Sequence, residues 1–206
     1  MTAKEKQGFG LYFLLAFGMA WLLQVYASLL LLRDGNAAAY QLLLVVSMFC
    51  PLVSVLLVQK FWLHQPTGIS WRPRLKERLG LLNGRLLGGV IWGVWHWPLM
   101  LLVGYEYGTN YLGAPLLGLV VWCVVCFALN TLLDWLYEKT GCIWVPAIAH
   151  GALNAVASMP VVLTDPAEAS YYTVLGPMPI GLIGMLPVLA VAVWLTLRQM
   201  KREEKN

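Results

Sequence analysis

Six uninterrupted apolar segments, each about as long as a bilayer is thick, most constrain what this chain can fold into. A helix needs about 20 predominantly apolar residues to cross the hydrocarbon core. Backbone groups in lipid must be hydrogen-bonded within a helix or a closed barrel, and barrel strands alternate in polarity, which these segments do not. We therefore predict an all-α, polytopic membrane bundle with six transmembrane helices at about residues 9–32, 40–63, 82–103, 114–137, 141–162 and 177–197.

Composition excludes a soluble protein. Hydrophobic residues make up 60% of the chain and charged residues 12%, whereas soluble domains carry about 25% charged residues. The first apolar segment is longer than the core of a signal peptide, which spans about 7–15 residues, so we expect it to be retained. No repeat or low-complexity tract stands out, and residues 1–206 are predicted to form a single transmembrane domain.

The distribution of basic residues predicts the topology. With six spans and both termini cytoplasmic, only Arg33 of the 14 lysines and arginines falls outside, which is the asymmetry that the positive-inside rule describes. The net charge of +4 is therefore a topology signal. We expect the lipid bilayer as a partner and no nucleic acid.

Two histidines lie deep within the predicted spans. His96 is 11 residues beyond Arg85, and His150 is 11 residues beyond Lys139, each counted from a cytoplasmic end. At about 1.5 Å per residue both lie near 16 Å into the membrane, so they lie at one depth and can share a site. Ionisable residues inside a membrane are functional hypotheses by default.

Each deep histidine has a second polar or aromatic residue on the same helix face. Trp92 precedes His96 by four residues, and Asn154 follows His150 by four. Pro98 cannot donate a backbone hydrogen bond, which loosens the helix beside His96. The alternative for His96 is a packing role, with its ring bonded to a neighbouring carbonyl.

Other polar residues have simpler interpretations. His64 lies at the cytoplasmic end of the second span, where a histidine costs little, and we assign it an interfacial role. Asp134 and Glu138 are expected to reach Lys139 or the basic loop and to serve structure rather than catalysis. Four cysteines lie in or beside apolar segments as small hydrophobes, without a disulfide framework: Cys50, Cys123, Cys126 and Cys142.

Two of these patterns resemble motifs of the CAAX protease and bacteriocin-processing (CPBP, or Abi) family of intramembrane endopeptidases. Residues 92–98, WGVWHWP, resemble the family's aromatic-xxx-histidine motif. Residues 139–154 resemble its histidine-xxx-asparagine motif, with His150 and Asn154 after a Thr-Gly helix start. Residues 48–51, MFCP, resemble its proline-marked early span, so the resemblance covers most of the chain.

One family motif, a glutamate pair followed by an arginine (EExxxR), is missing. The only adjacent glutamates, Glu203 and Glu204, lie after the last span. Either a block carrying one span and the glutamate helix is absent before Arg78, which we favour, or Trp71-Arg72 is a remnant of the motif. Glu77 or Glu106 could replace the lost carboxylate.

The resemblance implies hydrolysis of a peptide bond near the cytoplasmic face, with a lipidated protein C-terminus or a peptide as substrate, in a bacterial cell membrane. It implies His96, His150 and Asn154 as catalytic residues and Trp92 as a substrate contact. In the family a glutamate activates water, so its loss predicts impaired activity. A divalent metal such as zinc is a candidate cofactor, and His96 and His150 are its candidate ligands. Two alternatives remain: a non-catalytic relative that binds membrane peptides, as in bacteriocin self-immunity, and a metal or solute transporter.

Overall fold

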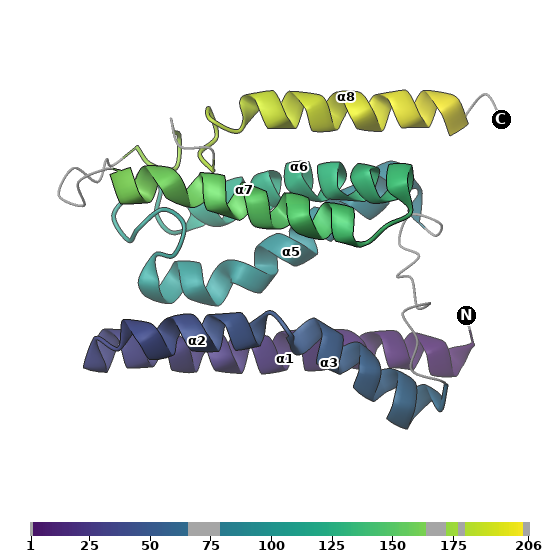
Figure 1. The fold of residues 1–206 in the computed structure, drawn as a ribbon, viewed down its shortest axis with the longest axis horizontal. Helices are drawn as coiled ribbons and strands as arrows, with labels where there is room; N and C mark the ends of the chain where they lie inside the picture. Colours follow the sequence, from purple (N-terminus) through teal and green to yellow (C-terminus); the bar gives the residue numbers. More distant parts are fainter. Residues whose placement is uncertain (1, 66–78, 164–171, 177–179, 204–206) are drawn as a thin grey trace. The chain divides into compact units, whose positions relative to one another are not determined.

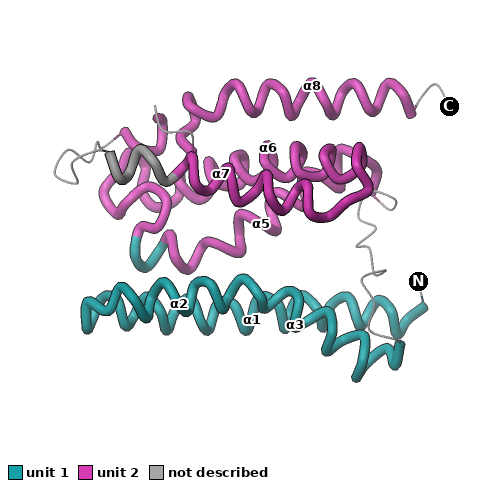
Figure 2. The backbone as a smooth tube through the Cα atoms, in the orientation of Figure 1, with its two compact units in different colours: residues 1–73, 101–103 teal, residues 74–100, 104–206 magenta. Residues whose placement is uncertain are grey.

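The computed structural model describes the backbone of residues 2–65, 79–163, 172–176 and 180–203, with the side chains of 158–163 excepted. Within these ranges the chain forms helices and turns and no strands (Figure 1), which confirms the all-α prediction. The chain divides into two compact units, residues 1–73 with 101–103, and residues 74–100 with 104–206 (Figure 2). The prediction of one domain stays a prediction, and each unit is described by itself.

The first unit pairs one long helix with an interrupted one. Helix α1 (Ala3–Asp34) begins at a capping box in which Thr2 and Glu5 satisfy each other's backbone N–H groups, and it ends at Gly35 with a φ of 60°. Its buried face consists mainly of small residues, which lets the neighbouring segments of the first unit approach closely. Gly8 shows this approach, because an added Cβ there would lie 3.2 Å from Leu63 and from Trp62.

The second predicted span is not one regular helix. It consists of α2 (Ala37–Ser47), α3 (Cys50–Leu57) and the π-helical η1 (Val58–Leu63). Pro51 lies in the first turn of α3, and it cannot donate to the carbonyl of Ser47 four residues earlier. The helix therefore breaks at Met48 and Phe49. His64 ends η1 in the left-handed region, with an exposed side chain.

The second unit contains α5 (Leu81–Val103), α6 (Leu116–Thr140), α7 (Trp144–Leu163) and α8 (Leu186–Glu203). Helix α6 is the central element, in contact with both α7 and α8. The core of the unit joins α6 to the segments that follow α5 and precede α8: Tyr107, Tyr111, Trp122, Val125, Cys126, Ala128, Val174 and Met185. Tyr107 donates a hydrogen bond to the carbonyl of Ile180, and Thr173 donates one to the carbonyl of Tyr107, so these two connections are tied together.

Four helical segments of the described chain are long and apolar enough to cross a membrane: residues 3–34, 37–63, 81–103 and 116–140. They agree with the first four predicted spans, and they make this a multi-pass membrane protein. Helix α7 occupies the fifth predicted span. Helix α8 begins at Leu186, nine residues later than predicted, because residues 181–185 form turns. The last two crossings and the cytoplasmic termini stay predictions.

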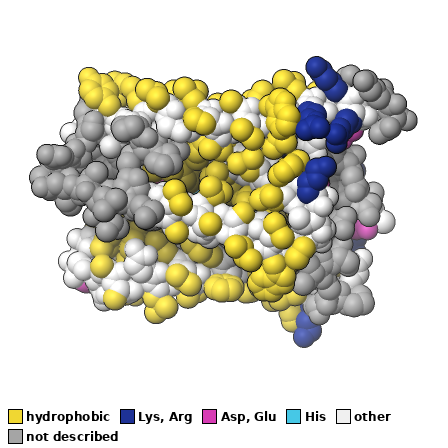
Figure 3. Space-filling model, turned by 45° about the horizontal axis from the view of Figure 1, so that its top comes forward, with side chains coloured by type: hydrophobic (Ala, Val, Ile, Leu, Met, Phe, Trp, Pro, Cys, Tyr) yellow, Lys and Arg dark blue, Asp and Glu magenta, His cyan; other side chains and the backbone are white. Residues whose placement is uncertain are grey.

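Exposed side chains are those expected next to lipid. Large apolar side chains such as Leu22, Leu116 and Trp144 are about 70% exposed, which a bilayer would cover. Figure 3 shows hydrophobic side chains over much of the face in view. Lys201 and Arg202 lie in the last turn of α8.

Candidate active site

The site is built on α5, where Trp92 and His96 are one turn apart. The Nδ1 atom of His96 lies 3.0 Å from the carbonyl oxygen of Trp92. A carbonyl can only accept, so Nδ1 carries the proton and donates it. The Nε2 atom of the neutral ring therefore keeps its lone pair, which is the form that can act as a base or bind a metal.

Two tryptophans hold the ring of His96. Trp95 of the same helix and Trp122 of α6 both contact it edge to face, with centroid separations of 4.8 and 5.3 Å. Trp122 is buried and also contacts Tyr107 of the loop after α5. Aromatic pairs in this geometry are favourable by about 0.5–1.5 kcal/mol each beyond area burial. The imidazole is thus held in one orientation by its backbone bond and by two rings.

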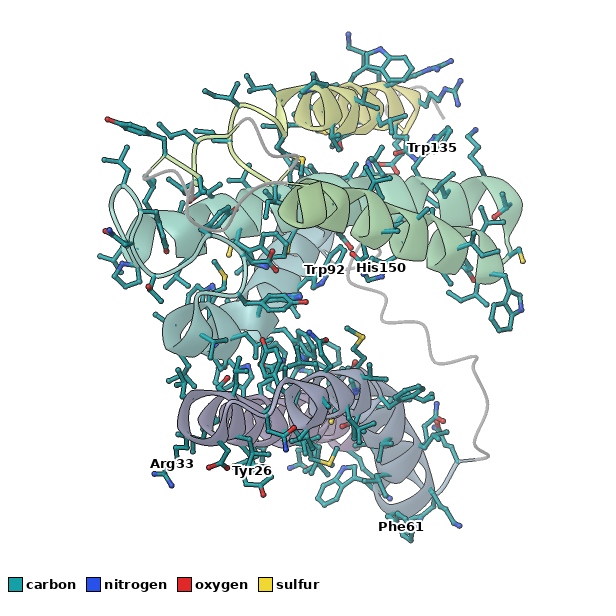
Figure 4. All side chains as sticks on the ribbon, turned by 60° about the vertical axis from the view of Figure 1, so that its left-hand side comes forward. Tyr26, Arg33, Phe61, Trp92, Trp135 and His150 are labelled. Carbon is teal, nitrogen blue, oxygen red and sulfur yellow. The ribbon has the colours of Figure 1, made fainter. Side chains whose placement is uncertain are left out.

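The second histidine reaches the same place from α7. The rings of Trp92 and His150 meet edge to face with centroids 5.1 Å apart, and Figure 4 shows the two side chains beside each other. Trp92 consequently contacts both histidines, His96 through its backbone carbonyl and His150 through its indole ring. The structure therefore brings together Trp92, His96 and His150.

Asn154 lies one turn beyond His150 on the same helix, and its side chain is exposed. The i and i+4 spacing puts both side chains on one face of α7. The catalytic role of Asn154 stays a prediction.

Glycines of α5 let α6 approach the site closely. A Cβ added to Gly89 would lie 2.5 Å from the Cα of Phe127, and one added to Gly93 would lie 2.6 Å from the Sγ of Cys123. Both separations are far below van der Waals contact. Gly89 and Gly93 therefore allow a close approach of α5 and α6, which ends at the contact between His96 and Trp122.

The described residues do not fit a catalytic metal. Catalytic zinc takes three protein ligands and keeps a position for water. No group of three His, Cys, Asp or Glu side chains within the described ranges is arranged to hold an ion. Within the described residues, His96 and His150 alone do not complete such a set. A metal cofactor stays a prediction.

The carboxylates proposed as replacements lie in different places. Glu77 and the segment around Trp71-Arg72 fall outside the described residues. Glu106 lies in the loop after α5, where it is partly buried, and burial raises the pKa of its carboxyl to about 8. A carboxyl of that pKa is mostly protonated at neutral pH, which makes it a poor base there.

Sequence reasoning missed a buried charge. Arg85, counted as a topology residue at a cytoplasmic end, is only 1% exposed and lies inside the second unit. Its guanidinium is 3.1 Å from the Oδ2 of Asp134, and Glu138 is 3.8 Å away. Arg85 is therefore a partner of both acids that the sequence did not predict. The expected contacts with Lys139 or the basic loop stay predictions. The available signal was the position of Arg85 four residues inside an apolar helix.

Comparison with known proteins gives one match. The model of the family described as type II CAAX prenyl endopeptidase Rce1-like matches residues 36–156. This range includes Trp92, His96, His150 and Asn154 and covers more than half of the chain. No curated protein and no solved structure matches the chain significantly.

Proposed function

This chain belongs to the Rce1-like family of type II CAAX prenyl endopeptidases, and from that premise we propose that it hydrolyses a peptide bond of a membrane-bound peptide at the site formed by His96 and His150. The family consists of intramembrane proteases, which act in the bilayer on protein substrates.

The observation that carries the proposal is the contact between the Nδ1 atom of His96 and the carbonyl oxygen of Trp92. Because the Nδ1 of His96 donates to this carbonyl, the Nε2 lone pair is available to take a proton from water. We assign His150, whose ring packs against that of Trp92, the role of holding the same water or the developing oxyanion. The amide of Asn154 is of the type that stabilises an oxyanion.

The reaction is expected to be slow. Relatives with the EExxxR motif use a glutamate to activate water, and this chain has adjacent glutamates only at 203 and 204. General-base catalysis contributes about 10²–10⁴-fold to a rate. A histidine alone would recover part of this factor, so we expect turnover below that of relatives with the glutamate pair.

The proposed substrate is a short peptide with a lipid-modified cysteine near its C-terminus. The test is to reconstitute the full chain in nanodiscs and to follow release of the C-terminal residues of a farnesylated CAAX peptide by mass spectrometry. His96→Ala and His150→Ala should each abolish release, and Asn154→Ala should reduce it. His64→Ala is the matched control, because His64 is exposed at the end of η1.

A second candidate is a non-catalytic relative that binds a membrane peptide without cleaving it, as in bacteriocin self-immunity. The missing glutamate pair favours it. The same nanodiscs distinguish the two by measuring binding of the fluorescently labelled peptide. Saturable binding with no cleavage by the wild type would support the second candidate and refute the first.

A further inference from the structure

Arg85 makes an unusually complete set of hydrogen bonds for a residue inside an apolar helix. Its Nε and Nη2 atoms both donate to the Oδ2 of Asp134, at 3.1 Å each. Its Nη1 donates to the Oγ1 of Thr196 at 3.0 Å, and its Nη2 also donates to the Oε1 of Gln199 at 2.5 Å. One guanidinium thus joins α5 to both α6 and α8.

The partners of Arg85 are themselves bonded to one another. The Nε2 of Gln199 donates to the Oε2 of Glu138 at 2.5 Å, which links α8 to α6 directly. The Nδ2 of Asn130 donates to the backbone carbonyl of Arg85 at 3.3 Å, which adds a second link between α5 and α6. We call these six residues the Arg85 cluster: Arg85, Asn130, Asp134, Glu138, Thr196 and Gln199.

Interhelical hydrogen bonds such as those of the Arg85 cluster contribute to helix association in lipid. An apolar side chain gains little by leaving lipid for another helix, so van der Waals packing and interhelical hydrogen bonds decide which helices associate. An arginine inside the membrane is costly unless it is paired. The guanidinium is 1% exposed and all three of its nitrogens donate to side chains of the cluster, so it is not available to a substrate.

The cluster is connected to His96 by continuous contact between α5 and α6. Arg85 and His96 are 11 residues apart, which is about three helical turns, so they lie on the same side of α5. Between them, Gly89 and Gly93 allow the backbone of α6 to lie directly against α5. The contact ends at the ring of Trp122, which packs against His96.

We propose that Arg85 is a positioning residue, whose bonds to α6 and α8 fix the register of α5 along α6 and so the position of His96. The guanidinium of Arg85 lies at one end of the contact between α5 and α6, and the imidazole of His96 lies at the other end. The inference rests on the proposed function only in that His96 is taken as part of the reactive site.

The test measures the access of His96 to reagent in the full-length protein in nanodiscs. Carbethoxylation by diethyl pyrocarbonate is quantified at each histidine by mass spectrometry, with exposed His64 as the internal reference. The variants are Arg85→Met, which removes the charge, and Arg85→Met combined with Asp134→Leu, which removes the pair. Arg198→Met is the matched control, because Arg198 is an exposed arginine of α8 whose guanidinium lies 5.1 Å from the ring of Trp194.

The modification rate of His96 should rise several-fold in both Arg85 variants and stay at the wild-type value in Arg198→Met. In the double variant no unpaired buried carboxylate of Asp134 remains, so a rise there reports lost register and not a stranded charge. If Arg85→Met does not fold, Arg85→Lys carries the test, because it keeps the charge but cannot reach α6 and α8 at once. An unchanged rate at His96 in a folded Arg85 variant would overturn the proposal.

Peptide cleavage provides a second readout. A displacement of about 1 Å at a reacting group can cost about 10²-fold in rate, so kcat should fall by about that factor while KM changes little. If the wild type does not cleave, the proposed function fails, and the labelling of His96 still decides the role of Arg85. If kcat falls but labelling does not change, the positioning proposal is wrong.

Discussion

The close approach of α5 and α6 is tested most directly by adding one methyl group at Gly89, where the two helices meet. In Gly89→Ala the new Cβ would lie 2.5 Å from the Cα and 2.7 Å from the backbone nitrogen of Phe127. These atoms belong to a helix backbone and cannot rotate away. Ordinary contact begins at about 3.5 Å, so the helices must separate by about 1 Å.

Overpacking of this kind costs about 1–3 kcal/mol, and the displacement reaches the site. We expect Gly89→Ala to lower the unfolding temperature of the purified protein in detergent, followed by tryptophan fluorescence. Peptide cleavage should fall by about 10²-fold, because the contact between His96 and Trp122 lies two turns further along α5.

Gly151→Ala and Gly18→Ala are the matched controls. Both glycines are helical, and an added Cβ would meet nothing within 4 Å. Alanine should leave stability unchanged or raise it by about 0.5–1 kcal/mol, since it is the better helix former. If Gly89→Ala unfolds at the same temperature as Gly18→Ala, the interhelical contact described here is wrong.

Three further outcomes are expected. Burial raises the pKa of Glu106 from 4.5 to about 8, so the folded state holds the proton more tightly than the unfolded state. The stability that this gives at pH 4.5 should be lost as the pH rises to 8, by at most about 1.4 kcal/mol per pH unit. Glu106→Gln should flatten the dependence of the unfolding temperature on pH, and an unaltered dependence would argue against a buried carboxyl. Trp92→Ala should reduce kcat/KM by about 3–10-fold through loss of the ring contact with His150, whereas Trp92→Phe should retain most of the wild-type kcat/KM. Equal values of kcat/KM for the two variants would exclude that contact. Tyr107→Phe should lower the free energy of unfolding by about 0.5–1.5 kcal/mol, because it removes a buried bond to the carbonyl of Ile180, whereas Tyr105→Phe, at an exposed position, should have no effect.

The missing glutamate pair matters for all activity predictions. If the wild type binds peptide but does not cleave it, the comparisons of kcat have no meaning, and only the stability and labelling results apply. Those results depend on packing, hydrogen bonding and the protonation of Glu106, so they test the structure independently of the reaction.

The sequence by itself determined the class of fold. The length and polarity of the apolar segments indicate that they lie in lipid, where the backbone must be helical. The four candidate spans lie where the first four of those segments predicted them. The histidine motifs were also readable, because an imidazole in an apolar helix is costly and its i and i+4 neighbours follow from helix geometry.

Only the tertiary structure decided how these residues meet. Periodicity places Trp92 and His96 on one face of α5, but it cannot show that the indole of Trp92 contacts His150 of another helix. Periodicity also cannot show that Arg85 points inward. A basic residue near the start of a span gives the same sequence pattern whether it faces water or a buried acid. That choice is made by Asp134 and Gln199, which lie 49 and 114 residues away in sequence. Long-range pairing of this kind depends on how helices pack, and only the folded chain specifies that.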